Sequence, residues 1–404
     1  MNRRIVVLIF SVVFFNTNLY SQSYSVDTIQ YNGDPNKIIN FVLIGDGYRA
    51  NQLNAYLTDA VNLSNYLFSV SPFLEYKDYF NVFAINVPSV DSGANHPGTS
   101  PDASCPSVPL SSVNTCCNST FDYANIHRLL VPQNYSAINN ILINNFPLYD
   151  QTIILVNSPY YGGSGGGNAT TSLHPTAPEI LVHEIGHSFS GLADEYWAGD
   201  QYAAEKPNLT QETNPLLVKW KNWVGTNGIG VYQHSGTTIA SAWYRPHNTC
   251  KMQSLSNDFC SVCKETIIKT IHNVIGSPIL ISYPTQSNIL YTNPLQFKLT
   301  LLKPNPNTLR VKWNLNGYQI ANNIDSITLI ASNLIVGSNV LSAEVIDTTQ
   351  LSRFDDHPIY HTYNVSWSIQ YFPVSVYEIG LTSFKIYPNP SREIFNIEFT
   401  SLLR

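Results

Sequence analysis

The segment that most constrains this chain is a short helical pattern that carries two histidines four residues apart. It runs from Thr176 to His187 with the sequence TAPEILVHEIGH. Thr176 and Glu179 stand at the spacing of a capping box, and a proline is tolerated in the first turn, so we expect a helix that begins just before the motif. One helical turn separates His183 from His187, so both imidazoles project from the same face.

Two imidazoles with a glutamate beside them are the side chains that a catalytic zinc ion requires. Imidazole nitrogen is a good zinc ligand, and three protein ligands leave a position for water. Glu184 is adjacent to His183 and can accept the proton of that water during attack on a carbonyl. The alternative is a chance match on a core helix, which is rare in a chain with 10 histidines. We therefore predict His183 and His187 as Zn²⁺ ligands and Glu184 as the catalytic base.

A third ligand is expected directly after the helix. Gly191 can end the helix and turn the chain back, and Asp194 and Glu195 follow within reach. Glu205 is a more distant alternative, with no clear helical pattern around it. Neighbouring residues of an extended segment point to opposite sides, so only one of Asp194 and Glu195 can face the metal. The shorter side chain of Asp194 suits a backbone that passes close to the ion, and we predict Asp194.

Residues further along the chain are candidates for the floor of the site and for substrate contacts. Met252 follows Cys250 and Lys251 in a cysteine-rich turn. We predict that it forms a floor beneath the metal, with ordinary core packing as the alternative. Tyr244 and Arg245 are candidates to orient the substrate or an oxyanion, although aromatic core packing explains them equally well.

The distribution of apolar residues predicts two kinds of domain. Apolar runs alternate with amphipathic stretches up to Gly276, which is typical of a mixed α/β (α+β) domain. After Pro278 the chain changes to short β-prone runs broken by Asn, Pro and Gly. We predict a catalytic domain at 24–276 and an all-β immunoglobulin-like sandwich at 277–373. The elements predicted in the first domain are strands at 39–44, 81–87 and 152–157 and a helix at 53–67.

The N-terminus has the pattern of a signal peptide. Arg3 and Arg4 precede an apolar run from Ile5 to Phe15, which is shorter than the roughly 20 residues of a membrane span. We therefore predict a signal peptide at 1–23, export from the cytoplasm and no transmembrane segment. A net charge of −6 with only 12% charged residues argues against a nucleic-acid partner.

The cysteines are even in number, which suits disulfides in an exported chain. Cys260 and Cys263 form a Cys-X-X-Cys pair, but a structural zinc site needs a second pair, and none is present. We therefore predict disulfides, with Cys250, Cys260 and Cys263 oxidised. The six positions are Cys105, Cys116, Cys117, Cys250, Cys260 and Cys263.

Four stretches resemble the IgA-peptidase family of bacterial metallopeptidases. They are residues 42–48, residues 157–166, the histidine helix through Tyr196, and residues 250–252. The likeness covers about residues 32–275 and implies a secreted zinc endopeptidase of metzincin type, acting on protein or peptide substrates. It also implies the same site residues, which are His183, His187 and Asp194 as ligands and Glu184 as catalyst. It does not imply that immunoglobulin is the substrate.

The C-terminal motif Tyr387-Pro388-Asn389-Pro390 resembles the start of a sorting domain of the Bacteroidetes type IX secretion system. A proline turn between strands is the alternative. The resemblance implies a partial sorting domain at 380–404, a role for the outer-membrane secretion machinery as partner, and a location outside the cell or on its surface.

Two functions compete on these observations. One is a zinc-dependent endopeptidase. The other is a non-catalytic secreted adhesin or binding protein that retains the peptidase fold. Glu184 favours the endopeptidase, because a protein that only binds has no need of a base beside two metal ligands.

Overall fold

A computed structural model describes residues 23–355, 357–373, 381–387 and 396–401 of the chain. The chain divides into two compact units. Unit 1 contains the residues up to 281 together with 300–311 and 344–363. Unit 2 contains 282–299, 312–343 and the described residues from 364 onward.

Unit 1 is built on a six-stranded sheet in the order β1-β3-β2-β4-β6-β5. The inner strands β3, β2, β4 and β6 are parallel, whereas β1 and β5 pair antiparallel at the two edges. The mixed α/β architecture predicted from the sequence is confirmed. The strands are β1 (Val26–Gln30), β2 (Ile39–Asp46), β3 (Phe80–Ile85), β4 (Gln151–Val156), β5 (Gly163–Ser164) and β6 (Ala169–Thr171).

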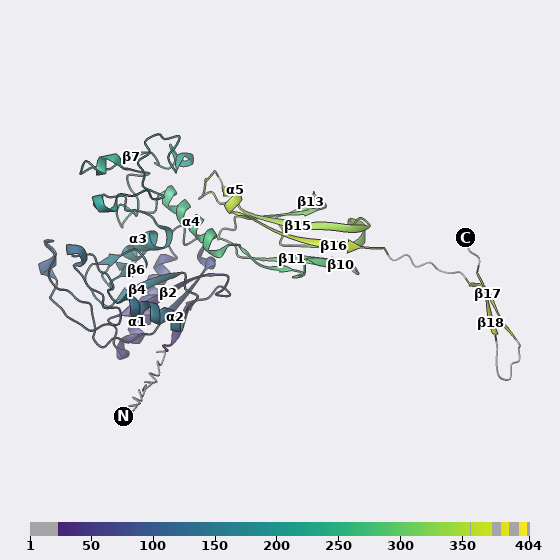
Figure 1. The fold of residues 1–404 in the computed structure, drawn as a ribbon, viewed down its shortest axis with the longest axis horizontal. Helices are drawn as coiled ribbons and strands as arrows, with labels where there is room; N and C mark the ends of the chain where they lie inside the picture. The colour runs from purple at the N-terminus through teal and green to yellow at the C-terminus, as the bar shows by residue number, and fades with distance from the viewer. Residues whose placement is uncertain (1–22, 356, 374–380, 388–395, 402–404) are drawn as a thin grey trace, which may run out of the picture. The chain divides into compact units, whose positions relative to one another are not determined.

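Helices cover both faces of this sheet (Figure 1). One face shares an apolar core with α1 (Leu53–Leu67), α3 (Ala177–Ser190) and α4 (Ser261–Ile275). The other face packs on α2 (Tyr135–Asn145). Successive side chains of β2 alternate between the two cores, and all eight residues of the strand are buried. The histidine helix α3 therefore lies on a sheet that is packed on both sides.

Unit 1 also contains two short strands before α4 and one short helix after it. They are β7 (Tyr232–Gln233), β8 (Tyr244–Arg245) and α5 (His357–Tyr360).

A β-rich region follows α4 and consists of two packed sheets, with strand orders β10-β16-β15-β12-β13 and β14-β11-β9. In unit 2, Phe297 lies 5.0 Å from Trp367 of the other sheet, and Trp367 stacks on Trp313 at 5.9 Å between ring centroids. The immunoglobulin-like type of this region stays a prediction. Its strands are β9 (Ile279–Tyr283), β10 (Asn288–Leu290), β11 (Leu295–Leu301), β12 (Leu309–Leu315), β13 (Tyr318–Asn322), β14 (Ser326–Leu329), β15 (Gly337–Asp347) and β16 (Thr362–Tyr371).

The two ends of the chain lie largely outside the described residues. Of the predicted signal peptide only Ser23 is described, and of the sorting motif only Tyr387, which ends β17 (Leu381–Tyr387). β17 pairs antiparallel with β18 (Asn396–Ser401). Among the described helices, none has both the length and the apolar character needed to cross a membrane.

Asp347, at the end of β15, is a buried polar centre of unit 1. One of its carboxylate oxygens accepts hydrogen bonds from the hydroxyl of Tyr76 at 2.6 Å and from Nε2 of His272 at 2.9 Å. The other oxygen accepts from the hydroxyl of Thr308 at 2.6 Å. Burial raises the pKa of Asp347, but these contacts, led by His272, outweigh burial and lower the pKa to about 2. Asp347 thus ties α4 to the β15 end within unit 1.

Asp347→Ala should lower the free energy of unfolding by about 3 kcal/mol or more, because it leaves Tyr76 and His272 buried without their acceptor. Denaturant unfolding measures the loss. The matched control is Asp355→Ala, which removes an exposed carboxylate paired with Lys221 and should cost clearly less. An equal loss in the two variants would contradict the assignment.

Candidate metal centre

The end of α3 is formed by a glycine in the left-handed region. Gly191 has φ 65° and ψ 22°, and its N–H donates to the carbonyl of His187 at 2.9 Å. A side chain at this φ would be strained, so glycine suits the position. The turn sends the chain back along the helix, where the carbonyl of Leu192 accepts a hydrogen bond from Nδ1 of His187 at 2.7 Å. The helix end expected from the sequence is therefore confirmed.

The start of α3 differs from the expected capping box. The helix begins at Ala177, but Thr176 makes no side-chain cap bond, and its hydroxyl lies 2.8 Å from Nδ1 of His174 instead. The carboxylate of Glu179 does not fold back on the helix; it accepts from the hydroxyl of Tyr66 and pairs with the buried ammonium of Lys251. A buried lysine needs a partner more than a helix end needs a second cap. Glu179 therefore links the helix to a distant turn.

Three side-chain atoms converge beside α3. Nε2 of His183 and Nε2 of His187 are 3.1 Å apart. Oδ1 of Asp194 lies 3.0 Å from the first nitrogen and 3.3 Å from the second. The structure thus brings together the two histidines and the aspartate singled out in the sequence. Glu195 faces a different cluster, and Glu205 pairs with Lys219 at 2.5 Å.

The convergence of these atoms fits a shared cation. Nδ1 of His183 donates to the carbonyl of Lys251 at 2.9 Å, and Nδ1 of His187 donates to Leu192. A carbonyl can only accept, so each Nδ1 carries a proton, and each ring in its neutral form presents a lone pair at Nε2. Two lone pairs and a carboxylate oxygen then face one another, and that oxygen makes no well-aligned hydrogen bond. Nitrogen and oxygen ligands at about 2.0–2.2 Å from a tetrahedral zinc would stand about 3.4 Å apart, close to the distances seen.

The pKa values of these side chains reflect the same crowding. Burial lowers the pKa of His187, but the carboxylate of Asp194 outweighs burial and raises it to about 9. Burial raises the pKa of Asp194, whereas the two histidines hold it well below its ordinary value of 3.8. A proton on His187 therefore neutralises the site when no cation does.

Glu184 lies beside this centre, under the glycine-rich loop that follows β5. A Cβ atom on Gly165 would lie 2.9 Å from Oε2 of Glu184 and 2.6 Å from Cβ of His187. Only glycine lets the loop backbone pass this close. Burial raises the pKa of Glu184, and His183 and His187 offset the rise only in part.

A cavity of about 900 Å³ opens over the centre. His183, Glu184, His187 and Asp194 all line it, together with the loop after β5 and residues on both sides of Trp197. The lining residues do not include Tyr244 or Arg245. The guanidinium of Arg245 instead donates to the backbone carbonyl of Glu195.

Arg128 and Tyr196 are polar groups of the cavity wall that the sequence did not reveal. Nη2 of Arg128 lies 3.5 Å from the hydroxyl of Tyr196, and the guanidinium carbon lies 5.9 Å from the centre of that ring. Burial raises the pKa of Tyr196, with the charge of Asp194 as a further cause, so the phenol keeps its proton. Tyr196 follows Asp194 and Glu195 directly, which is the one sequence signal that could have pointed to it.

Met252 is fully buried beneath α3. A Cβ atom on Gly186 would lie 2.8 Å from the sulfur of Met252, so the helix rests on this side chain through a glycine. The carbonyl of Met252 accepts from the N–H of Glu195 at 2.7 Å. The turn around Met252 thus contacts both the helix and the segment that carries Asp194.

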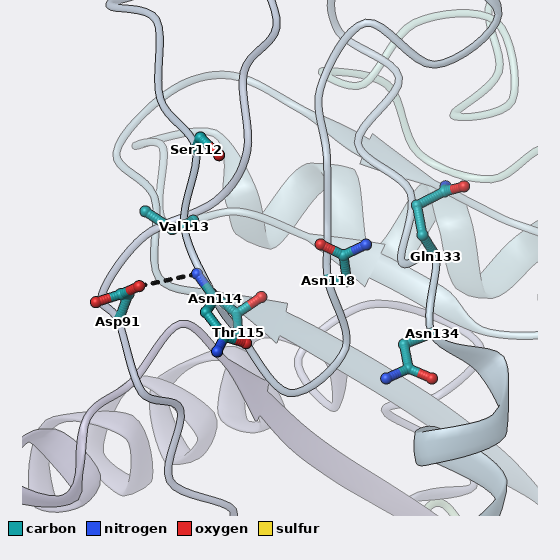
Figure 2. A pocket seen from close by; sticks show the side chains of 8 residues that line it. All are labelled: Asp91, Ser112, Val113, Asn114, Thr115, Asn118, Gln133 and Asn134. Atoms are coloured by element: carbon teal, nitrogen blue, oxygen red, sulfur yellow. Dashed lines mark hydrogen bonds between the residues drawn. The ribbon is translucent and has the colours of Figure 1, made fainter.

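A second cavity, of about 570 Å³, lies elsewhere in unit 1 (Figure 2). Asp91 is the one carboxylate among its lining residues, and it accepts a hydrogen bond from the N–H of Asn114 at 2.9 Å. The lining includes no histidine or cysteine, so it lacks the side chains for the predicted chemistry.

The predicted disulfides are not formed. All six cysteines are free in the structure. Sγ of Cys250 lies 3.7 Å from Sγ of Cys263, well beyond the S–S bond length of about 2.0 Å. Both thiols point instead into a shared cluster with Cys260 and Glu195.

The fold and the site together define a class of protein. A two-histidine, one-carboxylate centre with a glutamate beside it, on a helix under an open cavity, is the arrangement of metal-dependent hydrolases. The family model described as IgA peptidase M64 matches residues 28–231, about half of the chain. The chain belongs to this family of metallopeptidases. No curated protein matches the chain.

In protein stripped of metal, His187 should titrate near pH 9, and Asp194→Asn should lower the pKa of His187, since burial is then opposed only by the charge of Glu184 and the hydrogen bond to Leu192. Histidine NMR titration measures both values. Zinc must displace the proton of His187, so the affinity of the site for zinc should rise with pH up to about 9. A pKa of His187 that is the same in both proteins would contradict this account.

Proposed function

We propose that the protein is a zinc-dependent endopeptidase, with His183, His187 and Asp194 as the zinc ligands. The observation that carries the proposal is the meeting of two Nε2 lone pairs and a carboxylate oxygen within 3.3 Å at the base of an open cavity. A zinc ion held there would polarise a scissile carbonyl and make a water molecule more acidic.

Glu184 is the proton carrier of the proposed reaction. Its carboxylate lines the cavity one residue from His183, where it can accept the proton of the attacking water and pass it to the leaving amine nitrogen. Burial raises its pKa, which brings a carboxylate closer to the range in which it both takes and returns a proton near neutral pH.

Tyr196 and Arg128 are the proposed groups for the developing negative charge on the carbonyl oxygen. Both line the cavity that holds the metal ligands, and both present N–H or O–H donors. Tyr196 keeps its proton because burial raises its pKa, so it is a donor over the whole working range of pH. They replace Tyr244 and Arg245, which do not line the cavity, as the candidates for this role.

The proposed substrates are proteins or peptides. The family supplies the class of reaction, and the cavity is at the upper end of the roughly 300–1,000 Å³ of ligand pockets, which suits several residues of a peptide. The Gly191 turn and the Met252 floor support a metzincin-type arrangement. The family description names immunoglobulin A, and our proposal does not extend to that substrate.

We propose that the protein acts outside the cell. The signal-peptide pattern at residues 1–23 supports export, and the motif that begins at Tyr387 supports delivery through the type IX machinery. Both patterns rest on the sequence alone.

Glu184→Gln should keep zinc and fold but lower the turnover of a peptide substrate by about a hundredfold to ten-thousandfold, because the proton acceptor is gone while the ligands stay. Glu205→Gln, the same change on an exposed carboxylate, is the matched control and should keep full activity. Turnover of Glu184→Gln above about a tenth of wild type would show that another group takes the proton.

Asp194→Ala should abolish activity and lose the zinc held by His183 and His187, since two imidazoles alone form an incomplete site. Elemental analysis and a chelator competition measure the loss. Glu205→Ala is the control, because Glu205 is the alternative ligand and the structure pairs it with Lys219. A larger loss of zinc from the control than from Asp194→Ala would refute the assignment.

A further inference from the structure

Behind the histidine centre, three cysteines and a glutamate form a second buried cluster. Cys250, Cys260, Cys263 and Glu195 are all buried, and their ligand atoms lie within 4.8 Å of one another. Sγ of Cys263 lies 3.2 Å from Oε1 of Glu195, and Sγ of Cys260 lies 3.8 Å from the same oxygen. Sγ of Cys250 lies 3.7 Å from Sγ of Cys263.

These separations are those of a tetrahedral zinc shell. With Zn–S bonds of about 2.3 Å and a Zn–O bond of about 2.0–2.2 Å, two sulfurs stand about 3.8 Å apart and a sulfur and an oxygen about 3.5 Å apart. The observed sulfur–sulfur distance is 3.7 Å, and the two sulfur–oxygen distances, 3.2 Å and 3.8 Å, lie on either side of the second value.

Hydrogen bonds leave one oxygen of the cluster without a partner. Oε1 of Glu195 accepts from the side chain of Asn208 at 3.2 Å, but the buried Oε2 has no hydrogen-bond partner. A buried carboxylate oxygen left alone among thiols is costly, because thiols are weak donors. A single disulfide would also leave one of the three thiols and the carboxylate unmatched, whereas one cation binds all three sulfurs and neutralises the carboxylate.

Another buried cluster in unit 1 satisfies its carboxylate in a different way. His96, Cys105, Asp122 and His127 form another buried group of four. There the carboxylate of Asp122 accepts from Nδ1 of His127 at 2.8 Å and from the N–H of Thr99 at 2.8 Å. Ordinary hydrogen bonds satisfy that carboxylate, which sets it apart from Glu195.

We propose that Cys250, Cys260, Cys263 and Glu195 bind a second zinc ion with a structural role. Four protein ligands close the shell, and thiolate-rich tetrahedral sites select zinc. Cys260 occupies the N-cap position of α4 and Cys263 lies in the first turn of that helix, where the helix dipole favours negative charge. The N–H of Cys260 also donates to Sγ of Cys250 at 3.3 Å, an outer bond of the kind that supports a ligand.

The ion would hold together three segments that support the histidine centre. Cys250 lies two residues before Met252, Glu195 follows Asp194, and the remaining ligands come from the start of α4. Lys251, between Cys250 and Met252, supplies the carbonyl that orients His183. This inference does not depend on the proposed peptidase activity.

The deciding measurement removes the histidine site first. In full-length His183→Ala/His187→Ala protein, elemental analysis should still find about one zinc per chain. Zinc X-ray absorption of that protein should show about three sulfur neighbours near 2.3 Å and one lighter neighbour. Absence of zinc, iron in its place, or a zinc shell without sulfur overturns the proposal.

A pair of cysteine variants in the same background assigns the site. Cys263→Ser should lose the sulfur-bound zinc, whereas Cys105→Ser, the matched change in the other cluster, should keep it. The reverse pattern overturns the proposal. Where Cys263→Ser does not fold, the absorption spectrum of the histidine variant decides alone.

Mass spectrometry of non-reduced peptides completes the test. Free thiols at Cys250, Cys260 and Cys263 in zinc-loaded protein are expected, and a disulfide between any two of them overturns the proposal. The result is independent of Glu184→Gln, so the second zinc and the peptidase activity can fail separately.

Discussion

The left-handed turn at Gly191 is the constraint on which the rest of the site depends. It reverses the chain directly after α3, and the returning segment passes close enough for Leu192 to fix His187. Asp194 and Glu195 then point to opposite sides, as neighbours in extended backbone do. One carboxylate meets the two histidines, and the other meets the three cysteines. A single turn thereby positions one carboxylate in the histidine centre and one in the cysteine cluster.

The second support of the site is the buried pair of Lys251 and Glu179. Lys251 is only 3% exposed, and an unpaired ammonium there would cost several kcal/mol. Its partner lies in the first turn of α3, one turn before His183, while the carbonyl of Lys251 itself accepts from His183. The pair therefore sets the distance between the helix and the turn of Met252, and with it the orientation of His183 Nε2.

Features set by local sequence were predictable, and features set by long-range packing were not. The helix at 53–67 and the strands near 39–44 and 152–157 follow from periodicity, and the structure confirms them within a few residues. The helix end at Gly191 follows from the backbone freedom of glycine. The partners of Glu179, the place of Arg128 in the cavity and the gathering of three cysteines depend on segments far apart in the chain. Glu179 and Lys251, for example, are 72 residues apart. Spacing in one chain carries no record of such contacts.

Long-range contacts also determine how much of the chain is needed to form the histidine centre. The family model ends at residue 231, yet the acceptor of His183 Nδ1 is the carbonyl of Lys251, and the floor under α3 is Met252. α4, which begins at Ser261, contains Cys263, follows Cys260 directly and packs in the same core as α3. Neutral His183 keeps its Nε2 lone pair toward the centre only while that carbonyl holds its Nδ1 proton. The smallest part of the chain that can form the metal centre therefore runs past the matched region and through α4.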